Sequence, residues 1–235
     1  MAASLPTTIE GVLTRLRAID GSLPSGDGAA VFNRMYLTVT ERVAEAIERA
    51  EFTDAGFMAE LDVRFANLWL AAYDAVAAGD QPTSAWRPLF ETRAAAGVLP
   101  VQFALAGMNA HIEHDLPLAV VATCRARSLD PGPAVREDYE RVNAVLAGVE
   151  SEIRRSFLTW VGRGVDQEVG SVVHLVSAWN IDKARDVAWV TVEMLWALRA
   201  LRRLYERCVA TLSDTVGMAS RALLTPVPGV RGPIG

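Results

Sequence analysis

The sequence predicts an all-α protein, a single domain built as a bundle of seven or eight helices. Apolar residues recur with helical periodicity along most of the chain, and no stretch alternates as a series of strands would. The chain of 235 residues suits one well-buried domain better than two. Apolar residues make up 51% of it and charged residues 22%, which is typical of a folded globular protein.

Helical periodicity in the first half of the chain predicts four helices. Segments rich in Pro, Gly and Ser, or an Asp that can cap a helix, separate each helix from the next. The predicted helices cover approximately residues 9–19, 32–47, 54–78 and 88–96.

The second half is predicted to start with a central helix near Pro100, because proline suits the first turn of a helix. A linker at 128–133 precedes a long helix over about 135–160, and further helical periodicity covers 166–176. Asp182 is expected to cap a last long helix that contains Trp189 and Trp196. The domain is expected to span 1–225, and residues 226–235, rich in Pro and Gly, to form a flexible tail.

Charge and composition exclude several classes of partner. A net charge of −5 argues against nucleic-acid binding, and the densest basic run, 199–207, has the spacing of a solvated helix face. The most apolar segment, 187–201, contains Glu193 and Arg199, so no membrane span is expected. Two distant cysteines and the lack of a signal peptide predict a cytoplasmic protein. Homo-oligomerisation stays open.

The segment 108–117 carries the densest chemistry of the chain. Asn109, His111, His114 and Asp115 fall within two helical turns, and His111 and Asp115 are four residues apart on one face. Pro117 lacks an N–H group, so a helix that continued through it would leave a backbone carbonyl without its usual partner. These features favour a functional site over a packing surface. The roles of His114 and of His174, which lies in an apolar run typical of a core, stay open.

Two further carboxylates fall where periodicity places the core. Asp62 lies on the buried stripe of its helix, and Asp186 stands beside Arg185, one turn before Trp189. A buried carboxylate needs a metal, a histidine, an arginine or another carboxyl group. We therefore predict the following site: catalytic His111, Asp115, Asp62 and Asp186, and substrate-binding Asn109, Arg185 and Asn67. The same residues also fit a purely structural reading, as ion pairs or intrahelical hydrogen bonds.

The metal hypothesis rests on His111, Asp115 and Asp62 as ligands. One imidazole with carboxylates suits a single divalent Fe, Mn or Zn ion. The paired Glu-x-x-His of ferritin-like sites and the HExxH zinc motif are absent. His114-Asp115 matches the dipeptide of the HD phosphohydrolases, but no histidine precedes His111 to supply their upstream ligand. Without a metal, the same groups make an acid–base set.

Three short segments together resemble a known family. They are 61–67 (LDVRFAN), 107–117 with its Asn-Ala-His-Ile-x-x-Asp-Leu-Pro core, and 184–189 (ARDVAW). This set resembles an actinobacterial family catalogued as a domain of unknown function, with a match from about Phe32 to Trp196. An actinobacterial source also agrees with the basic residues, of which Lys183 is the only lysine. The resemblance supports the choice of site residues and implies no reaction.

The leading expectation for function is an enzyme of specialised metabolism, with metal-assisted hydrolytic or lyase-type chemistry on a small, largely apolar substrate. The first alternative is a metal-free acid–base cyclase, isomerase or dehydratase. The second is a non-catalytic helical binding or scaffold protein. An enzyme predicts a cavity that reaches His111 and Asp62 together, whereas a scaffold predicts fully paired groups without a cavity.

Overall fold

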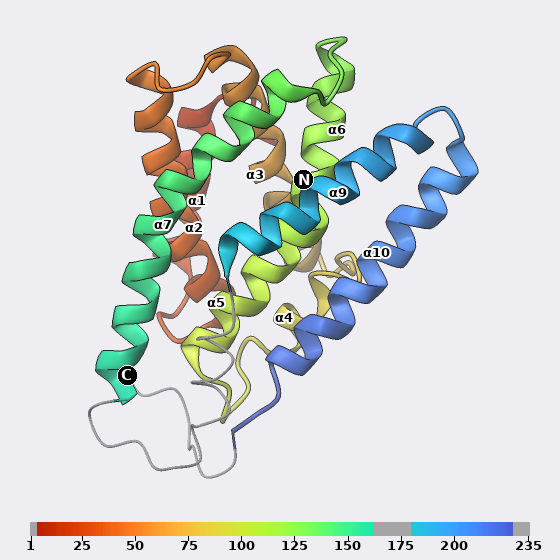
Figure 1. Ribbon diagram of the computed structural model, residues 1–235. Helices are drawn as coiled ribbons and strands as arrows, with labels where there is room; N and C mark the ends of the chain where they lie inside the picture. The colour runs from red at the N-terminus through yellow and green to blue at the C-terminus, as the bar shows by residue number, and fades with distance from the viewer. Residues whose placement is uncertain (1–3, 162–179, 228–235) are drawn as a thin grey trace.

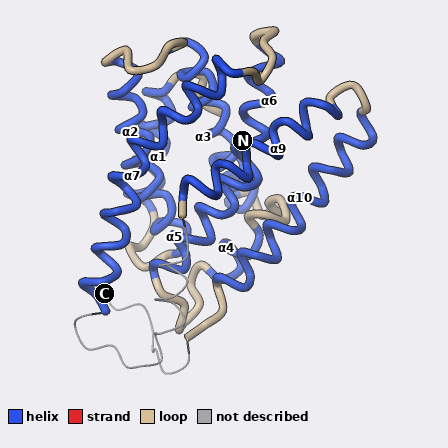
Figure 2. Tube along the Cα trace, viewed as in Figure 1, coloured by secondary structure: helices blue, strands red, loops and turns tan. Residues whose placement is uncertain are grey.

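The computed structural model describes residues 4–161 and 180–227, with side chains for 4–147 and 180–227. These residues form helices joined by short loops, and no strand occurs among them (Figures 1 and 2). The helices are α1 (Ile9–Ser22), α2 (Gly28–Glu48), α3 (Ala55–Ala77), α4 (Arg87–Thr92), α5 (Pro100–Asn109), the π-helix η1 (Ala110–Asp115), α6 (Leu116–Ala126), α7 (Pro133–Val161), α9 (Ile181–Leu198) and α10 (Arg202–Leu223). The predicted all-α class is confirmed.

One continuous central helix, made of α5, η1 and α6, organises the bundle. The helices α2, α3, α9 and α10 all contact it, and α9 crosses it while α10 runs along one side (Figure 1). Its first turn is tied to the C-terminal end of α10 by the buried Gln102. The Gln102 amide accepts from the Leu99 N–H (2.9 Å) and donates to the carbonyls of Leu223 and Thr225 (2.8 Å each). The central helix is therefore held on several sides.

The predicted helix starts are correct at α1 and α3, and wrong at α9. Thr8 caps α1 and Asp54 caps α3 through side-chain oxygens that accept backbone N–H bonds. The side chain of Asn180 caps α9 by accepting from the Lys183 N–H (2.8 Å), whereas Asp182 already lies in the first turn. The predicted last helix is also interrupted: α9 ends at Leu198, and α10 begins at Arg202.

The core forms two packed clusters on either side of the central helix. One, between α1, α2, α3 and α4, is rich in aromatic rings, among them Phe32, Trp69 and Trp86. The other, between α3, α6, α7 and α9, contains Tyr139 and Trp189. The two clusters meet at partly buried side chains that pack against both, namely Met35 and Val39 in the middle of α2, Phe65 on α3 and Leu223 at the end of α10. This junction is where the polar residues of the predicted site come together.

Some predictions fall outside the described residues. The predicted helix at 166–176 and His174 lie there, as do residues 228–235 of the predicted tail. Val227, inside the predicted tail, is buried, and its N–H donates to the carbonyl of Gly97 (2.8 Å). Among the described helices, none is long and apolar enough to cross a membrane.

Substituting Gly217 with Ala is expected to destabilise the protein by about 1–3 kcal/mol. Gly217 is buried where α10 packs against the loop before α4, and an added Cβ would overlap the carbonyl oxygen of Ser84. Backbone atoms cannot move aside as a flexible side chain can. Urea denaturation of the variant measures the loss. Gly21→Ala, in an open position of α1, is the control and should leave stability equal or up to about 1 kcal/mol higher. An equal change in stability for Gly217→Ala and Gly21→Ala would contradict the close contact between Gly217 and Ser84.

Candidate functional site

The central helix passes through Pro117 by widening into one π-helical stretch, η1. Pro117 cannot donate to the carbonyl of Glu113, and the Leu116 N–H instead bonds to the carbonyl of His111, five residues back. The predicted break at Pro117 is thus a local change of pitch within a continuous helix. Such π-helical turns are frequent at functional sites. Here it places His111, His114 and Asp115 all in the interior.

The Asp115 carboxylate accepts hydrogen bonds from three side chains. Its Oδ2 lies 3.0 Å from His111 Nδ1 and 2.9 Å from Trp86 Nε1, and its Oδ1 lies 2.7 Å from His114 Nδ1. Asp115 and both histidines are at most 3% exposed. Charge-assisted hydrogen bonds of this kind compensate a buried carboxylate.

These bonds determine the protonation state of His111. Burial raises the pKa of Asp115, but the hydrogen bonds from His111 and His114 outweigh burial and hold that pKa below its usual 3.8. An ionised Asp115 can only accept, so the proton of neutral His111 sits on Nδ1. Burial lowers the pKa of His111 below 6.5, although the hydrogen bond to Asp115 alone would raise that pKa. At neutral pH, His111 Nε2 therefore presents an unprotonated lone pair.

A cavity of about 80 Å³ lies on the Nε2 side of this network. Its wall is largely apolar and comes from α2, α3, the central helix, α7 and α9. The polar side chains that line it are Tyr36, Asp62, His111, Tyr139 and Arg185. Small-molecule sites typically combine a mostly apolar wall with a few polar groups.

Three buried polar atoms at this cavity have no hydrogen-bond partner within the described residues. They are the Tyr36 hydroxyl, Asp62 Oδ2 and His111 Nε2. Burial raises the pKa of Asp62 to about 7, so its carboxyl group is partly protonated at neutral pH. Burial and the nearby Asp62 charge raise the pKa of Tyr36 well above 10 and outweigh the Thr40 hydroxyl, which lowers it and donates its own hydrogen bond to the Tyr36 carbonyl (2.9 Å). Orphaned buried polar atoms are rare in folded proteins, and three around one cavity indicate groups that a ligand would satisfy.

Aromatic rings hold the His111 imidazole in place. The Phe65 ring stacks on it with centroids 3.6 Å apart and planes 9° apart, and the Tyr36 ring meets it edge-on at 4.3 Å. Together with the bond to Asp115, these contacts leave His111 one orientation. A fixed ring with one free nitrogen can act as a base without reorganising.

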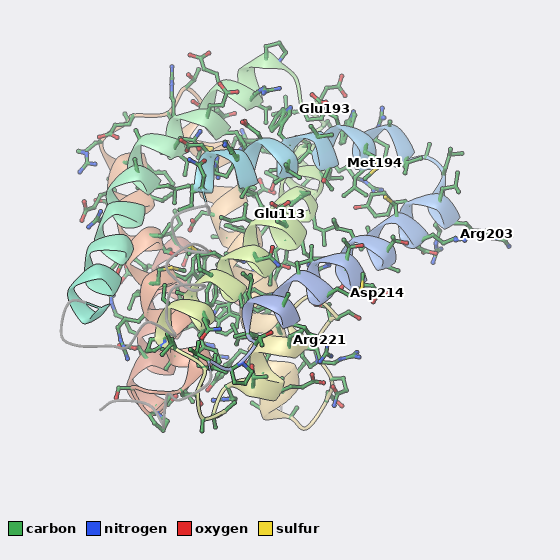
Figure 3. All side chains as sticks on the ribbon, turned by 60° about the horizontal axis from the view of Figure 1, so that its bottom comes forward. Glu113, Glu193, Met194, Arg203, Asp214 and Arg221 are labelled. Atoms are coloured by element: carbon green, nitrogen blue, oxygen red, sulfur yellow. The ribbon has the colours of Figure 1, made fainter. Side chains whose placement is uncertain are left out.

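The structure brings together only part of the predicted site. His111, Asp62 and Arg185 line the cavity, and Asp115 lies behind His111 as its hydrogen-bond acceptor. Asp186 does not belong to the site, because the face of α9 that packs inward carries Arg185, Ala188 and Trp189 and leaves Asp186 exposed. Glu193 on the same helix is exposed as well, and Met194 lies on the side of α9 toward α10, with its sulfur 3.7 Å from Cys208 Sγ (Figure 3).

The two predicted amide residues have structural contacts away from the cavity. Asn109 Nδ2 donates to the carbonyl of Val216 (3.1 Å) and to Ser220 Oγ (3.0 Å), which docks α10 on the central helix. Asn67 Nδ2 donates to the carbonyl of Pro6 (2.9 Å), and its buried Oδ1 has no partner among the described residues. Neither lines the cavity.

Sequence reasoning missed the parts played by Tyr36, Trp86 and His114. His114 is buried within η1, and its Nδ1 bonds to the neighbouring Asp115. His114 also lines a second, more open cavity beside α10. In the sequence, Pro117, two residues after Asp115, was the signal that the helix pitch changes here. Nothing local in the sequence connects Tyr36 or Trp86 with Asp115.

The predicted metal ligands do not gather around one point. In the described part of the chain, no group of three or more His, Cys, Asp or Glu side chains is placed to hold a metal ion. Asp115 directs both oxygens at His111, His114 and Trp86. Of the atoms predicted to bind a metal, His111 Nε2 and Asp62 Oδ2 are the two that have no hydrogen-bond partner among the described residues.

Comparison with known proteins assigns the chain to a family. No curated protein and no solved structure matches it. One family model matches residues 9–226, which include every helix described above. The chain thus belongs to the family of unknown function DUF5995.

Proposed function

We propose that this protein is a metal-free acid–base enzyme that acts on a small, largely apolar molecule, as an isomerase, dehydratase or cyclase. The single observation that carries the proposal is the set of unpaired atoms of Tyr36, Asp62 and His111 around one apolar cavity. Such chemistry needs a base that is unprotonated at neutral pH, as His111 is, and an acid whose pKa burial raises toward neutrality, as it does at Asp62.

In this proposal His111 is the general base and Asp62 the general acid. Nε2 of His111 takes a proton from the substrate, and Asp115 stabilises the imidazolium that forms by accepting from its Nδ1–H. The protonated fraction of Asp62, available because its pKa is about 7, returns a proton at another atom of the substrate. The Tyr36 hydroxyl donates a hydrogen bond to a substrate oxygen, and the apolar wall excludes bulk water.

A probe reaction tests the base without knowledge of the natural substrate. The compound 5-nitrobenzisoxazole opens to a coloured phenolate when a base removes its ring proton. We expect wild-type protein to open it faster than an equal concentration of free imidazole, and His111→Ala to lower this rate by roughly a hundredfold or more. His114→Ala is the matched control, because His114 contacts the same carboxylate from outside the cavity, and it should keep most of the rate. An unchanged rate in His111→Ala would refute the assignment.

The same variant decides between this function and the metal-assisted one. His111 Nε2 and Asp62 Oδ2 would be the protein ligands of a metal in this cavity, and hydrolytic or lyase-type chemistry would then follow. Elemental analysis of untagged wild-type protein beside His111→Ala provides the test. Near-stoichiometric Fe, Mn or Zn that disappears in the variant would replace the acid–base proposal with the metal-assisted one.

A further inference from the structure

Arg185 is a buried cation held by neutral groups. It is 4% exposed, on the inward face of α9. Its Nε donates to Asn143 Oδ1 (2.6 Å), one terminal nitrogen donates to the carbonyl of Tyr139, and the guanidinium lies 4.0 Å from the centre of the Tyr139 ring. The Tyr139 hydroxyl in turn donates to the carbonyl of Arg185 (2.7 Å). These contacts fix the side chain in position but bring no negative charge to it.

Among the side chains that the structure describes, those of 4–147 and 180–227, no carboxylate lies at ion-pair distance from Arg185. The acidic groups that act on it from a distance are Asp182 and Asp186 on its own helix and Glu140 on α7. All three are exposed, and Glu140 pairs with Arg136 (2.7 Å). Burying a cation without a counter-ion costs several kcal/mol, and arginine keeps its proton under such conditions.

Asp62, on the same cavity wall, does not supply the missing charge. Asp62 lies beyond ion-pair distance from Arg185, like the other described carboxylates, and burial raises the pKa of Asp62 to about 7, so its carboxyl group is partly protonated at neutral pH. The cavity thus has two separate polar regions. One is the acid–base group of Asp62, His111 and Tyr36, and the other is the guanidinium of Arg185, with apolar side chains such as Leu146 and Ile181 in the wall.

We propose that the cavity binds a small carboxylate with an apolar body, and that Arg185 is the residue that pairs with its carboxylate. The planar guanidinium can donate two parallel N–H bonds to a carboxylate, the largely apolar wall suits an apolar body beside it, and the guanidinium is already fixed in place by Tyr139 and Asn143. The reactive part of the ligand then faces His111 and Asp62. This last step rests on the proposed function, whereas the binding of the carboxylate does not.

The test compares acids with amides of the same skeleton, by calorimetric titration of wild-type protein with phenylacetate and phenylacetamide, and with hexanoate and hexanamide. We expect at least one acid to bind tenfold or more tightly than its amide. Arg185→Gln should abolish this preference. Arg199→Gln should keep it, because Arg199, at the end of the same helix, also stacks on an aromatic ring and bonds to a backbone carbonyl but lies outside the cavity.

Equal binding of acid and amide by wild-type protein, or no binding of either acid at millimolar concentration, would overturn the proposal. The wild-type comparison holds even if Arg185→Gln fails to fold, and Arg185→Lys, which keeps the charge but loses the planar fork, should retain a reduced preference. His111→Ala should leave the preference for acids intact. Loss of the probe reaction therefore reports on His111, and loss of the acid preference reports on Arg185.

Discussion

Asp115→Ala is expected to lower the free energy of unfolding by about 3–5 kcal/mol, a large fraction of the stability of a typical domain. The substitution removes the one acceptor shared by His111, His114 and Trp86 and leaves three donors buried without partners. The substitution also leaves a cavity in the core, because Asp115 is fully buried and its carboxyl group is not replaced. Urea denaturation at pH 7, with the slope checked for two-state behaviour, measures the change.

Asp186→Ala is the matched control for this loss. Both positions are helical aspartates, but Asp186 is exposed on α9, and its replacement should change stability by less than about 0.5 kcal/mol. A similar, small effect of the two substitutions would show that Asp115 is not the centre of a buried network.

Asp62→Asn is expected to stabilise the protein above pH 7 by about 2–4 kcal/mol relative to wild type. The carboxyl of Asp62 has a pKa of about 7 when folded, against 3.8 for the unperturbed group. Between these pH values the folded state binds more protons than the unfolded state. Its contribution to stability is therefore present at low pH, falls as the pH rises from about 4 to about 7, and stays lost above that.

The measurement is the difference in unfolding free energy between Asp62→Asn and wild type, from pH 4 to pH 8. Asp115 and His111 have lowered pKa values and so contribute with the opposite sign, but they are present in both proteins and cancel in the difference. The difference should grow with pH in favour of the variant. Asp186→Asn, at an exposed position of α9, is the control. A difference for Asp62→Asn that does not change with pH would mean that the pKa of Asp62 is not raised.

A stabilising effect at Asp62 would have a functional meaning. Proteins retain a costly buried group where activity needs it, and the same substitution should then weaken catalysis while it strengthens the fold. Asp62 carries this expectation because its unpaired oxygen belongs to a residue that lines the same cavity as His111.

The helical class, most helix boundaries and the inward position of Asp62, His111 and Asp115 follow from the sequence. Periodicity of apolar residues records which side of a helix faces the core, and capping residues such as Asp54 mark where a helix begins. Both signals are local, so a single sequence contains them. Asp186 shows the limit of these signals. It directly follows the buried Arg185 on α9, yet the turn of the helix between neighbouring residues leaves Asp186 exposed.

Only the tertiary structure decided which polar groups meet. Tyr36, Asp62, His111 and Arg185 come from four separate stretches of the chain, and their common cavity depends on how α2, α3, α9 and the central helix pack. The wider pitch of η1 before Pro117 is likewise a feature that a period of 3.6 residues does not describe. The sequence by itself determined an all-α bundle with carboxylates and a histidine on core-facing sides. Packing between helices, which no local pattern encodes, brought Trp86 to Asp115 and left Asp62 Oδ2 and His111 Nε2 without a hydrogen-bond partner among the described residues.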